Sequence, residues 1–521
     1  MSYLLSLQRL FSLEHLHRLK CLGRKASSLL SGLAFAAVLS ACGGGGGGTP
    51  EPTAKPQPTS GATPSSTPSP SPTTSPTPPP KPTQPPIATG WEDPLIISAP
   101  RQGGNGGARV GIDALGQSLT VWKQDTKPGT VLWSSRFVPG LGWGAPLALY
   151  RGLDSVPHHE LAMAQSNGKA MLVWTQINNA GAYSVVARAY NSTASTWSAP
   201  SVVSNETRTM SQPSVDIDAT GNAAVVWTQL DTRFRYNVVA NRYTGSGNWG
   251  SSTVVGSTTV SGSTDLNAKV AMTGSGEAVA VWRRSGNSER GFWSSRASAG
   301  GNWDTGARIV DIPGFGSSNL PGAYEISTAP EIAADGNGNA MLAWSQVTVN
   351  PIQSHMRSLR YSAGAWSTVQ QAMNVPVGQN ALPFVRLKIN PQGQAVAAWV
   401  TDGVTKIWAN RSRSDGTWET AQVVNATATG TIGTQPNVGI DDQGAMSVVW
   451  TQSGIMGNRF EPATGWGVAQ RLENYDPTTS ISADPVIAMN ARGYASLVWT
   501  QVLDLVSIGS QIAGRFYNSG R

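Results

Sequence analysis

Tryptophan recurs along most of this chain at a nearly constant interval, and that interval constrains the fold more than any other feature. Each unit of about 54 residues holds one tryptophan in a V-W-x-Q segment and one in a G-x-W segment. The first set is Trp122, Trp174, Trp227, Trp282, Trp344, Trp399, Trp450 and Trp499, and the second is Trp91, Trp143, Trp197, Trp249, Trp303, Trp366, Trp418 and Trp466. Eight units with room for four short strands each predict an all-β, eight-bladed β-propeller.

The offset between the two sets predicts how the ring closes. Trp91 precedes the first complete unit, whereas the last unit runs through Arg515-Phe516-Tyr517 and lacks its own G-x-W segment. The segment from Trp91 to Ser98 can supply that missing outer strand. We therefore expect residues 90–521 to form one propeller, closed by an N-terminal strand in its last blade.

A D-x-x-G turn separates the first two predicted strands of most units, as in Asp218 to Gly221. Asp or Asn bonds its own backbone in such a turn, and Gly accepts a positive φ. The segment Asp335-Gly336-Asn337-Gly338-Asn339 also suggests a calcium loop, but it lacks the glycine at the sixth position and the closing glutamate. We expect structural turns, with no metal site and no cofactor.

Each predicted third strand carries one arginine. The set is Arg136, Arg188, Arg242, Arg296, Arg360, Arg411, Arg459 and Arg515. A guanidinium that recurs in every blade can stack on a repeat aromatic ring or bind carbonyls between strands. It can also supply one ligand contact per blade in a multivalent lectin. Since a residue common to all repeats usually serves the repeat itself, we favour the structural interpretation.

The first 41 residues have the pattern of an export signal, in which a basic segment precedes the apolar run Leu29–Leu39. Leu39-Ser40-Ala41-Cys42 resembles a bacterial lipobox, and the resemblance implies cleavage before Cys42 and a lipid on its sulfur. Gly43 follows, a choice that the lipoprotein family associates with the outer membrane. We expect an outer-membrane lipoprotein that faces outward. A periplasm-facing orientation and an ordinary secretory signal remain alternatives.

Residues 42–89 predict a disordered stalk. Six glycines are followed by a tract of Pro, Thr and Ser that cannot bury a core. Proline stiffens such a tract toward about 3 Å per residue, so the stalk can extend beyond about 100 Å. It is either a spacer that clears the surface polymer or a passive linker.

Charge argues against a nucleic-acid partner. Of the net charge of +7, the first 41 residues hold four units, from five basic residues and one acid, and the stalk holds one. About two remain on the propeller, whereas nucleic-acid binding usually needs a basic patch. The only cysteines are Cys21 and Cys42, so packing and ring closure must stabilise the domain without disulfides.

Departures from the repeat suggest where a ligand binds. Four residues before the turn, the first strand changes from blade to blade: Arg109, Leu161, Ser214, Lys269, Glu331, Arg386, Asn437 and Val486. Two residues before it, Asp216 and Lys388 stand out among small residues. Two long loops around blade five, one from Asp311 to Pro330 with Tyr324 and Glu325 and the other from Val347 to Met356 with His355, are expected to stand above these strands. Blade four replaces V-W-x-Q with Arg283-Arg284. We predict a polar ligand at the channel mouth near blades four to six, bound by Lys269, Glu331, Arg386, Lys388, Tyr324, Glu325 and His355. A solvated channel without a ligand, with loops lengthened by drift, is the alternative.

At the level of the fold, the repeat resembles bacterial propellers of the sialidase-like and propeller-lectin kind, over roughly Trp91 to Arg521. The Asp-box of sialidases is absent, since the turn Asp218 lies nine residues before Trp227. The arginine triad and tyrosine nucleophile of that family cannot be placed. His158-His159-Glu160 is not a metal spacing with a visible third ligand, and no G-x-S-x-G, P-loop or zinc motif is present.

We therefore expect a monomeric surface protein that binds a glycan or an envelope protein without catalysis. A glycan-cleaving enzyme is the first alternative, and it would need two carboxylates converging at about 5–10 Å. Glu160, Glu325, Glu331 and Asp504 are the acids available in predicted loops, and the sequence does not show that any two of them converge. A scaffold for outer-membrane assembly is the second alternative.

Overall fold

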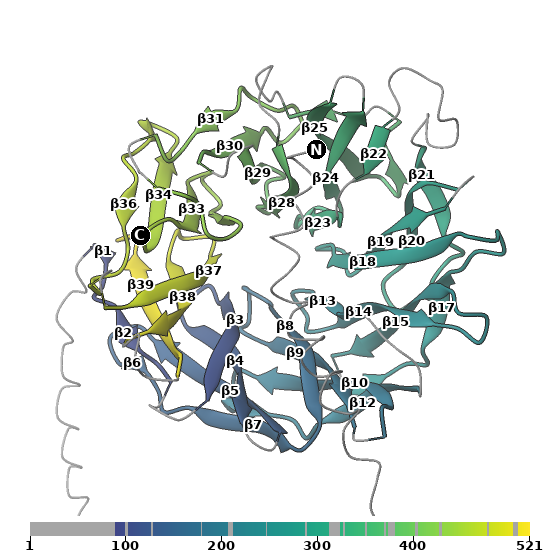
Figure 1. The fold of residues 1–521 in the computed structure, drawn as a ribbon, viewed down its shortest axis with the longest axis horizontal. Coiled ribbons are helices and arrows are strands. Elements are labelled where there is room, and N and C mark those ends of the chain that lie inside the picture. The colour runs from purple at the N-terminus through teal and green to yellow at the C-terminus, as the bar shows by residue number, and fades with distance from the viewer. Residues whose placement is uncertain are drawn as a thin grey trace, which may run out of the picture. The chain divides into compact units, whose positions relative to one another are not determined.

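Every element in the described part of the chain is a β-strand, and the strands form eight separate antiparallel sheets. The computed structural model describes residues 89–98, 103–126, 129–178, 180–206, 212–245, 247–286, 289–311, 324–326, 329–349, 352–368, 371–373, 381–401, 405–426, 430–476, 479–503 and 509–521. Figure 1 shows the sheets arranged as blades around a central opening. The domain is an eight-bladed β-propeller, as the tryptophan repeat predicts. The export signal, Cys42 and nearly all of the stalk lie outside the described residues.

Each blade runs outward from the centre through consecutive antiparallel strands. From blade one to blade eight, the innermost strands are β3 (Gly104–Ile112), β8 (Ser155–Met163), β13 (Ser214–Ile217), β18 (Thr264–Met272), β23 (Glu331–Ala334), β28 (Ala381–Ile389), β32 (Asn437–Ile440) and β37 (Ile481–Met489). The second strands are β4 (Ser118–Thr126), β9 (Ala170–Ile177), β14 (Ala223–Leu230), β19 (Ala278–Ser285), β24 (Ala340–Val349), β29 (Ala395–Thr401), β33 (Met446–Thr451) and β38 (Ala495–Val502). The third strands are β5 (Gly129–Val138), β10 (Tyr183–Asn191), β15 (Tyr236–Thr244), β20 (Gly291–Ala297), β25 (Ile352–Ser362), β30 (Ile407–Ser412), β34 (Ile455–Glu461) and β39 (Gln511–Asn518).

The outermost strand of most blades is split into two short pieces. In chain order the pieces are β1 (Gly90–Trp91), β2 (Leu95–Ile96), β6 (Gly142–Trp143), β7 (Leu147–Gly152), β11 (Thr196–Trp197), β12 (Ser201–Glu206), β16 (Asn248–Trp249), β17 (Thr253–Gly256), β21 (Ala307–Asp311), β26 (Ala365–Trp366), β27 (Gln371–Ala372), β31 (Gln422–Val423), β35 (Gly465–Trp466) and β36 (Gln470–Arg471). Blades four and six have one piece each, and there Trp303 and Trp418 make only isolated bridges to the third strand. One further strand, β22 (Tyr324–Ile326), pairs with β24 in blade five.

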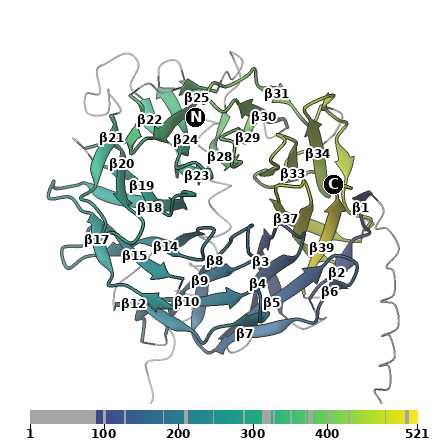
Figure 2. The same ribbon diagram turned by 180° about the vertical axis from the view of Figure 1, so that it is seen from behind.

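The ring closes through the N-terminal segment, as the offset of the tryptophans predicts. In blade eight, β1 and β2 both pair with β39, the last strand of the chain. Trp91 lies opposite Tyr517, and Ile96 lies opposite Ala513. Figure 2 shows β1 and β2 beside β39 at the junction of the two ends. The Arg515 side chain strengthens this closure, because its Nε donates to the carbonyl oxygen of Glu92.

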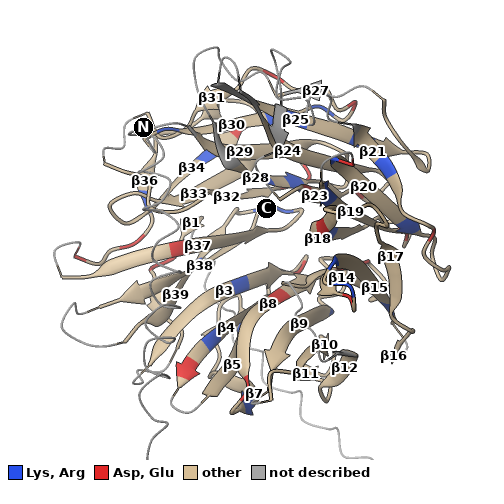
Figure 3. Ribbon diagram, turned by 45° about the vertical axis from the view of Figure 1, so that its right-hand side comes forward, with Lys and Arg blue, Asp and Glu red and all other residues tan. Residues whose placement is uncertain are grey.

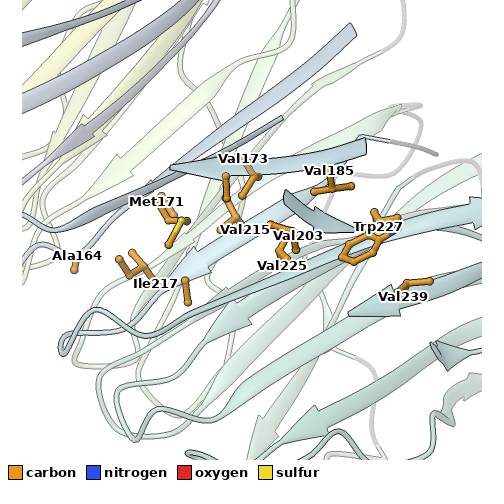
Figure 4. Close-up of a cluster of buried hydrophobic side chains, with 13 residues drawn as sticks. Ala164, Met171, Val173, Val185, Val203, Val215, Ile217, Val225, Trp227 and Val239 are labelled. Atoms are coloured by element: carbon orange, nitrogen blue, oxygen red, sulfur yellow. The ribbon is translucent and has the colours of Figure 1, made fainter. Parts of the chain in front are cut away.

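The core lies between the blades. All eight second-strand tryptophans are at most 1% exposed, and each lies in a cluster of buried apolar side chains from two blades. Figure 4 shows Met171 and Val173 of blade two lying beside Val215 and Ile217 of blade three, and Val185 and Val203 of blade two lying beside Trp227 of blade three. Sheets that are buried on both faces explain why the second strands are almost wholly apolar.

The D-x-x-G segments form the expected turns. The Oδ1 atom of Asp218 accepts hydrogen bonds from the backbone N–H groups of Thr220 and Asn222 at 2.9 Å. Asp335 accepts those of Asn337 and Asn339 at 2.8 Å, so its carboxylate caps the turn. We call this end of the ring the turn face and the opposite end the loop face. No helix in the described residues is long and apolar enough to cross a membrane.

Candidate functional site

The inner strands of all eight blades line a central channel with a cavity of about 500 Å³. This confirms that the variable first strand is the innermost one. Residues four positions before the turn form a ring toward the loop face, which we call the mouth ring. Residues two positions before the turn form a second ring, the turn-side ring. Side chains alternate along a strand, so both sets point to the same side, into the channel.

The mouth ring differs from the sequence prediction in blade two. Register shows that its members each lie opposite the residue before a second-strand tryptophan: Arg109, Glu160, Ser214, Lys269, Glu331, Arg386, Asn437 and Val486. Glu160 therefore takes the place assigned to Leu161. The blade-two turn, closed by the hydrogen bond from Ala164 N to Lys169 O, is one residue longer than that of blade one. The extra residue shifts the count, and it also moves Glu160 from an expected loop onto strand β8.

Charges of opposite sign alternate around part of the mouth ring and pair between neighbouring blades. Arg109 Nε lies 2.8 Å from Glu160 Oε2, and Arg386 Nη1 lies 2.5 Å from Glu331 Oε1. Figure 3 shows a basic segment on β3 beside an acidic one on β8. Burial acts to raise the pKa of Glu160, but the charges of Arg109 and Lys269 outweigh it and lower the pKa to about 2. Glu160 is thus an ionised acceptor rather than a proton donor.

The turn-side ring is made of glycine and alanine except for Asp216 and Lys388. The carboxylate of Asp216 accepts hydrogen bonds from the N–H of Met272 at 2.8 Å and of Ile217 at 2.9 Å. Burial raises the pKa of Asp216, while these bonds and the charge of Lys388 lower it. The small residues keep this part of the channel open.

Blades four to six carry an excess of positive charge on the channel wall. Lys269, Arg386 and Lys388 face the carboxylate of Glu331 there, whereas the carboxylate of Asp335 caps its own turn. Among the described residues, the ammonium groups of Lys269 and Lys388 have no hydrogen-bond or ion-pair partner. Both groups interact with carboxylates only at longer range, Lys269 with Glu160 and Lys388 with Asp216. This half of the channel can therefore offer donors to an anionic or hydroxyl-rich ligand.

The remaining predicted site residues occupy strands rather than loops. The backbone of Tyr324 and Glu325 belongs to β22, which pairs with the same strand as β23 and continues the inner edge of blade five toward the loop face. Their side chains, and residues 312–323, lie outside the described part of the chain. His355 lies on β25, opposite Gln346, so the whole of β24 separates it from the inner strand. Burial and the charge of Arg357 lower the pKa of His355.

The Arg283-Arg284 departure in blade four is not part of the channel. Arg284 is 4% exposed, and its guanidinium makes two hydrogen bonds, of 2.7 and 2.9 Å, to the fully buried carboxylate of Asp265. It also stacks on the ring of Trp293 at 3.8 Å. Arg284 therefore makes internal polar contacts at the position where other blades have the glutamine of V-W-x-Q. This departure from the repeat does not indicate a ligand site in the channel.

At least six of the eight repeat arginines contact a neighbouring blade, which supports the structural interpretation. Arg242 of blade three donates to the carbonyl oxygens of Ala297, Ser298 and Gly276 of blade four at 2.6–3.1 Å. Arg296 donates to Gly364 of blade five at 2.7 Å. In blades six and seven, the guanidinium groups lie 4.6 and 4.7 Å from an aromatic ring of the next blade.

Within the described ranges, no group of three or more His, Cys, Asp or Glu side chains could hold a metal ion. The two carboxylates of the mouth ring lie in blades two and five, and an arginine of an adjacent blade binds each of them.

Comparisons with known proteins do not assign this chain to a family. No protein-family model matches the chain, and no curated protein sequence matches it. Among solved structures, it is similar to the polysaccharide lyase Uly1, with 8% identity, a TM-score of 0.46, and coverage of 79% of this chain and 89% of that chain. It is also similar to an α-L-arabinanase of Penicillium chrysogenum, with 10% identity, a TM-score of 0.40, and coverage of 83% and 99%. A leech intramolecular trans-sialidase has 8% identity and a TM-score of 0.36, with coverage of 82% and 94%. Similarities this weak contribute nothing to the assignment of function.

Proposed function

We propose that this protein binds an acidic, hydroxyl-rich ligand, a glycan with carboxylate or sulfate groups, at the loop-face mouth of its channel, and releases it unchanged. The observation that carries the proposal is the pair of ammonium groups of Lys269 and Lys388, which flank the Glu331–Arg386 ion pair and have no hydrogen-bond or ion-pair partner in the described part of the chain. The lysines would bind the anionic group. Arg386 would donate hydrogen bonds to neighbouring hydroxyls, and the carboxylate of Glu331 would accept hydrogen bonds from them.

The ionisation and the bonding partners of the channel carboxylates favour binding over glycan cleavage. Hydrolysis needs one protonated carboxyl and one carboxylate placed together. Glu160 is held ionised, and Glu331 is bound by Arg386. Asp216 has a raised pKa, but two backbone N–H groups hold its oxygens.

Calorimetric titration with hexasaccharides of galacturonate and of galactose tests the proposal. We expect the acidic probe to bind, and Lys269→Met with Lys388→Met to weaken it at least about tenfold, since each charged hydrogen bond contributes about 1.5–3 kcal/mol. Lys169→Met, on the turn face, is the control and should bind as the natural chain does. Unchanged affinity in the double variant, or shortened products by mass spectrometry, would contradict the proposal.

We further propose that the propeller is monomeric and that a lipid on Cys42 tethers it to the outer membrane, facing outward. The lipobox resemblance of Leu39-Ser40-Ala41-Cys42 supports the anchor. Cys42→Ala should move the protein from the membrane fraction to the soluble fraction. Protease added to intact cells should degrade the tethered protein. Membrane retention of the variant would refute the anchor, and protection from protease would refute the orientation.

A further inference from the structure

A second cavity, of about 350 Å³, opens on the loop face between blades one and two. Its floor is the glycine-rich start of β3, Gly104 to Gly107, and its walls are the end of β4 and the start of β8. Gln212 of blade three closes one side. Its volume is at the lower end of the range for small-ligand sites.

The glycines of the floor differ in what they do. Gly107 has a φ of 63°, and a Cβ there would lie 3.1 Å from Cε1 of His159, so packing requires this glycine. Gly106 has an ordinary backbone conformation, and a Cβ there would have no atom of the described residues within 4 Å. Nothing in the described part of the chain therefore requires a glycine at position 106. Its missing side chain leaves the floor of the cavity bare and its backbone open to close approach.

The polar groups of the cavity are balanced in charge. Arg109 pairs with Glu160 at 2.8 Å, and Lys123 Nζ lies 3.3 Å from Asp125 Oδ2. His159 is 5% exposed, and its Nε2 atom has no hydrogen-bond partner among the described residues. Burial and the charge of Arg109 lower the pKa of His159 to about 3, which keeps the imidazole neutral at pH 7. The cavity thus offers both donors and acceptors without an excess of either charge.

We propose that this cavity, named the blade-one pocket, binds an uncharged polyol ring, that is, one neutral sugar residue. Paired ionic groups can donate to and accept from adjacent hydroxyls, and the bare strand lets the face of a ring lie against the backbone. An anion would instead favour the lysines of blades four to six. The inference rests on the proposed function only in that both ligands are glycans, and it concerns a different site.

The test uses the full-length chain and four neutral hexasaccharides, of glucose, galactose, mannose and xylose, by calorimetric titration. We expect at least one of them to bind. Gly106→Leu, whose side chain would fill the cavity, should then weaken that binding at least about tenfold, and Gly106→Ala should weaken it less. The melting temperature of both variants should remain within about 2 °C of that of the natural chain. Ala199→Leu, on the exposed outer rim, is the control for an added apolar side chain.

Two results would overturn the inference: binding of none of the four neutral probes, or undiminished binding by Gly106→Leu. Titration with the galacturonate probe distinguishes failure of the blade-one pocket from failure of the proposed function. Lys269→Met with Lys388→Met should weaken the galacturonate probe and leave the neutral probe unaffected, whereas Gly106→Leu should do the reverse. If the acidic probe binds as expected and no neutral probe binds, only the blade-one pocket is contradicted, and the proposal for the channel site is unaffected.

Discussion

At the scale of single residues, the recurring polar side chains serve the blade. The indole N–H of four second-strand tryptophans donates to the glutamine two residues later, at 2.9–3.2 Å. This bond satisfies the buried indole N–H, which accounts for the V-W-x-Q segment in these four blades. Most of the repeat arginines act between blades, and Arg242 makes three hydrogen bonds to carbonyl oxygens of the following blade.

Replacing Arg242 tests that structural role. Arg242→Ala removes three hydrogen bonds to carbonyl oxygens, of which that of Ser298 keeps a second donor, the N–H of Gly301. We expect the free energy of unfolding to fall by about 2 kcal/mol. Urea denaturation measures the change, with the exposed Arg233→Ala as the matched control. Affinity for the galacturonate probe should remain that of the natural chain. A stable Arg242→Ala that has lost binding would instead indicate a lectin site.

The buried His159 makes stability depend on pH. Its pKa is about 3 in the folded protein, because of burial and the charge of Arg109, against an ordinary value of 6.5. A pKa lowered by folding gives stability that is complete above about pH 6.5 and is lost as the pH falls toward 3. At pH 5 the loss of unfolding free energy due to His159 amounts to about 2 kcal/mol. This pH is above the ordinary pKa of Glu160, so protonation of Glu160 contributes little to the change. Urea denaturation at pH 8 and at pH 5 gives the fall in unfolding free energy for each protein. That fall should be about 2 kcal/mol smaller in His159→Leu than in the natural chain. An equal fall in the two proteins would contradict the role of His159.

At the scale of elements, an aromatic pair joins the third strand to the outer G-x-W piece. In six blades a Phe or Tyr of the third strand lies 5.2–5.5 Å from the fourth-strand tryptophan. Blades four and six have Ala297 and Ser412 instead, and these are the two blades whose tryptophan makes only an isolated bridge. Next to Ser412 lies a cavity of about 240 Å³. The pair therefore holds the outer strand in place.

Exchanging these residues tests the role of the pair. Ser412→Phe should partly fill the cavity and pair with Trp418, so we expect a gain in unfolding free energy of about 1 kcal/mol. The opposite change in blade three, Tyr243→Ser, removes the ring beside Trp249 and should cost at least about 2 kcal/mol. Both are measured by urea denaturation. A loss of stability in Ser412→Phe would show that the cavity does not accept the ring.

At the scale of the whole molecule, the ends of the domain meet in one blade. Hydrogen bonds tie the first and last turns as well, since Asn490 Nδ2 donates to the carbonyl oxygen of Asp113 at 2.7 Å. Without disulfides in the folded domain, this closure keeps the ring from opening.

Deleting residues 1–98 tests the closure, because it removes β1 and β2 and leaves the edge of β39 unpaired. Exposed strand edges aggregate, so we expect a melting temperature at least about 10 °C lower, or precipitation. Deleting only residues 1–86 keeps both strands and is the matched control. Identical melting of the two truncated chains would show that the N-terminal strands do not close the ring.

The number of blades, the strand order and the closing strand could be predicted from the sequence, because each depends on a pattern that repeats eight times. The same pattern placed Lys269, Glu331, Arg386 and Lys388 on the channel wall. It misplaced His355, which lies on a third strand, because loop length alone does not show where a strand begins.

What the repeat could not determine is which side chains meet between blades. One additional residue in the blade-two turn puts Glu160 rather than Leu161 in the mouth ring, since a shift of one residue in a strand turns each side chain to the other face. The Arg109–Glu160 and Arg386–Glu331 pairs join residues more than fifty positions apart. The open space above Gly106 likewise depends on three blades at once. A local sequence pattern determines the blade, but only the curvature of the closed ring determines the distances across its channel.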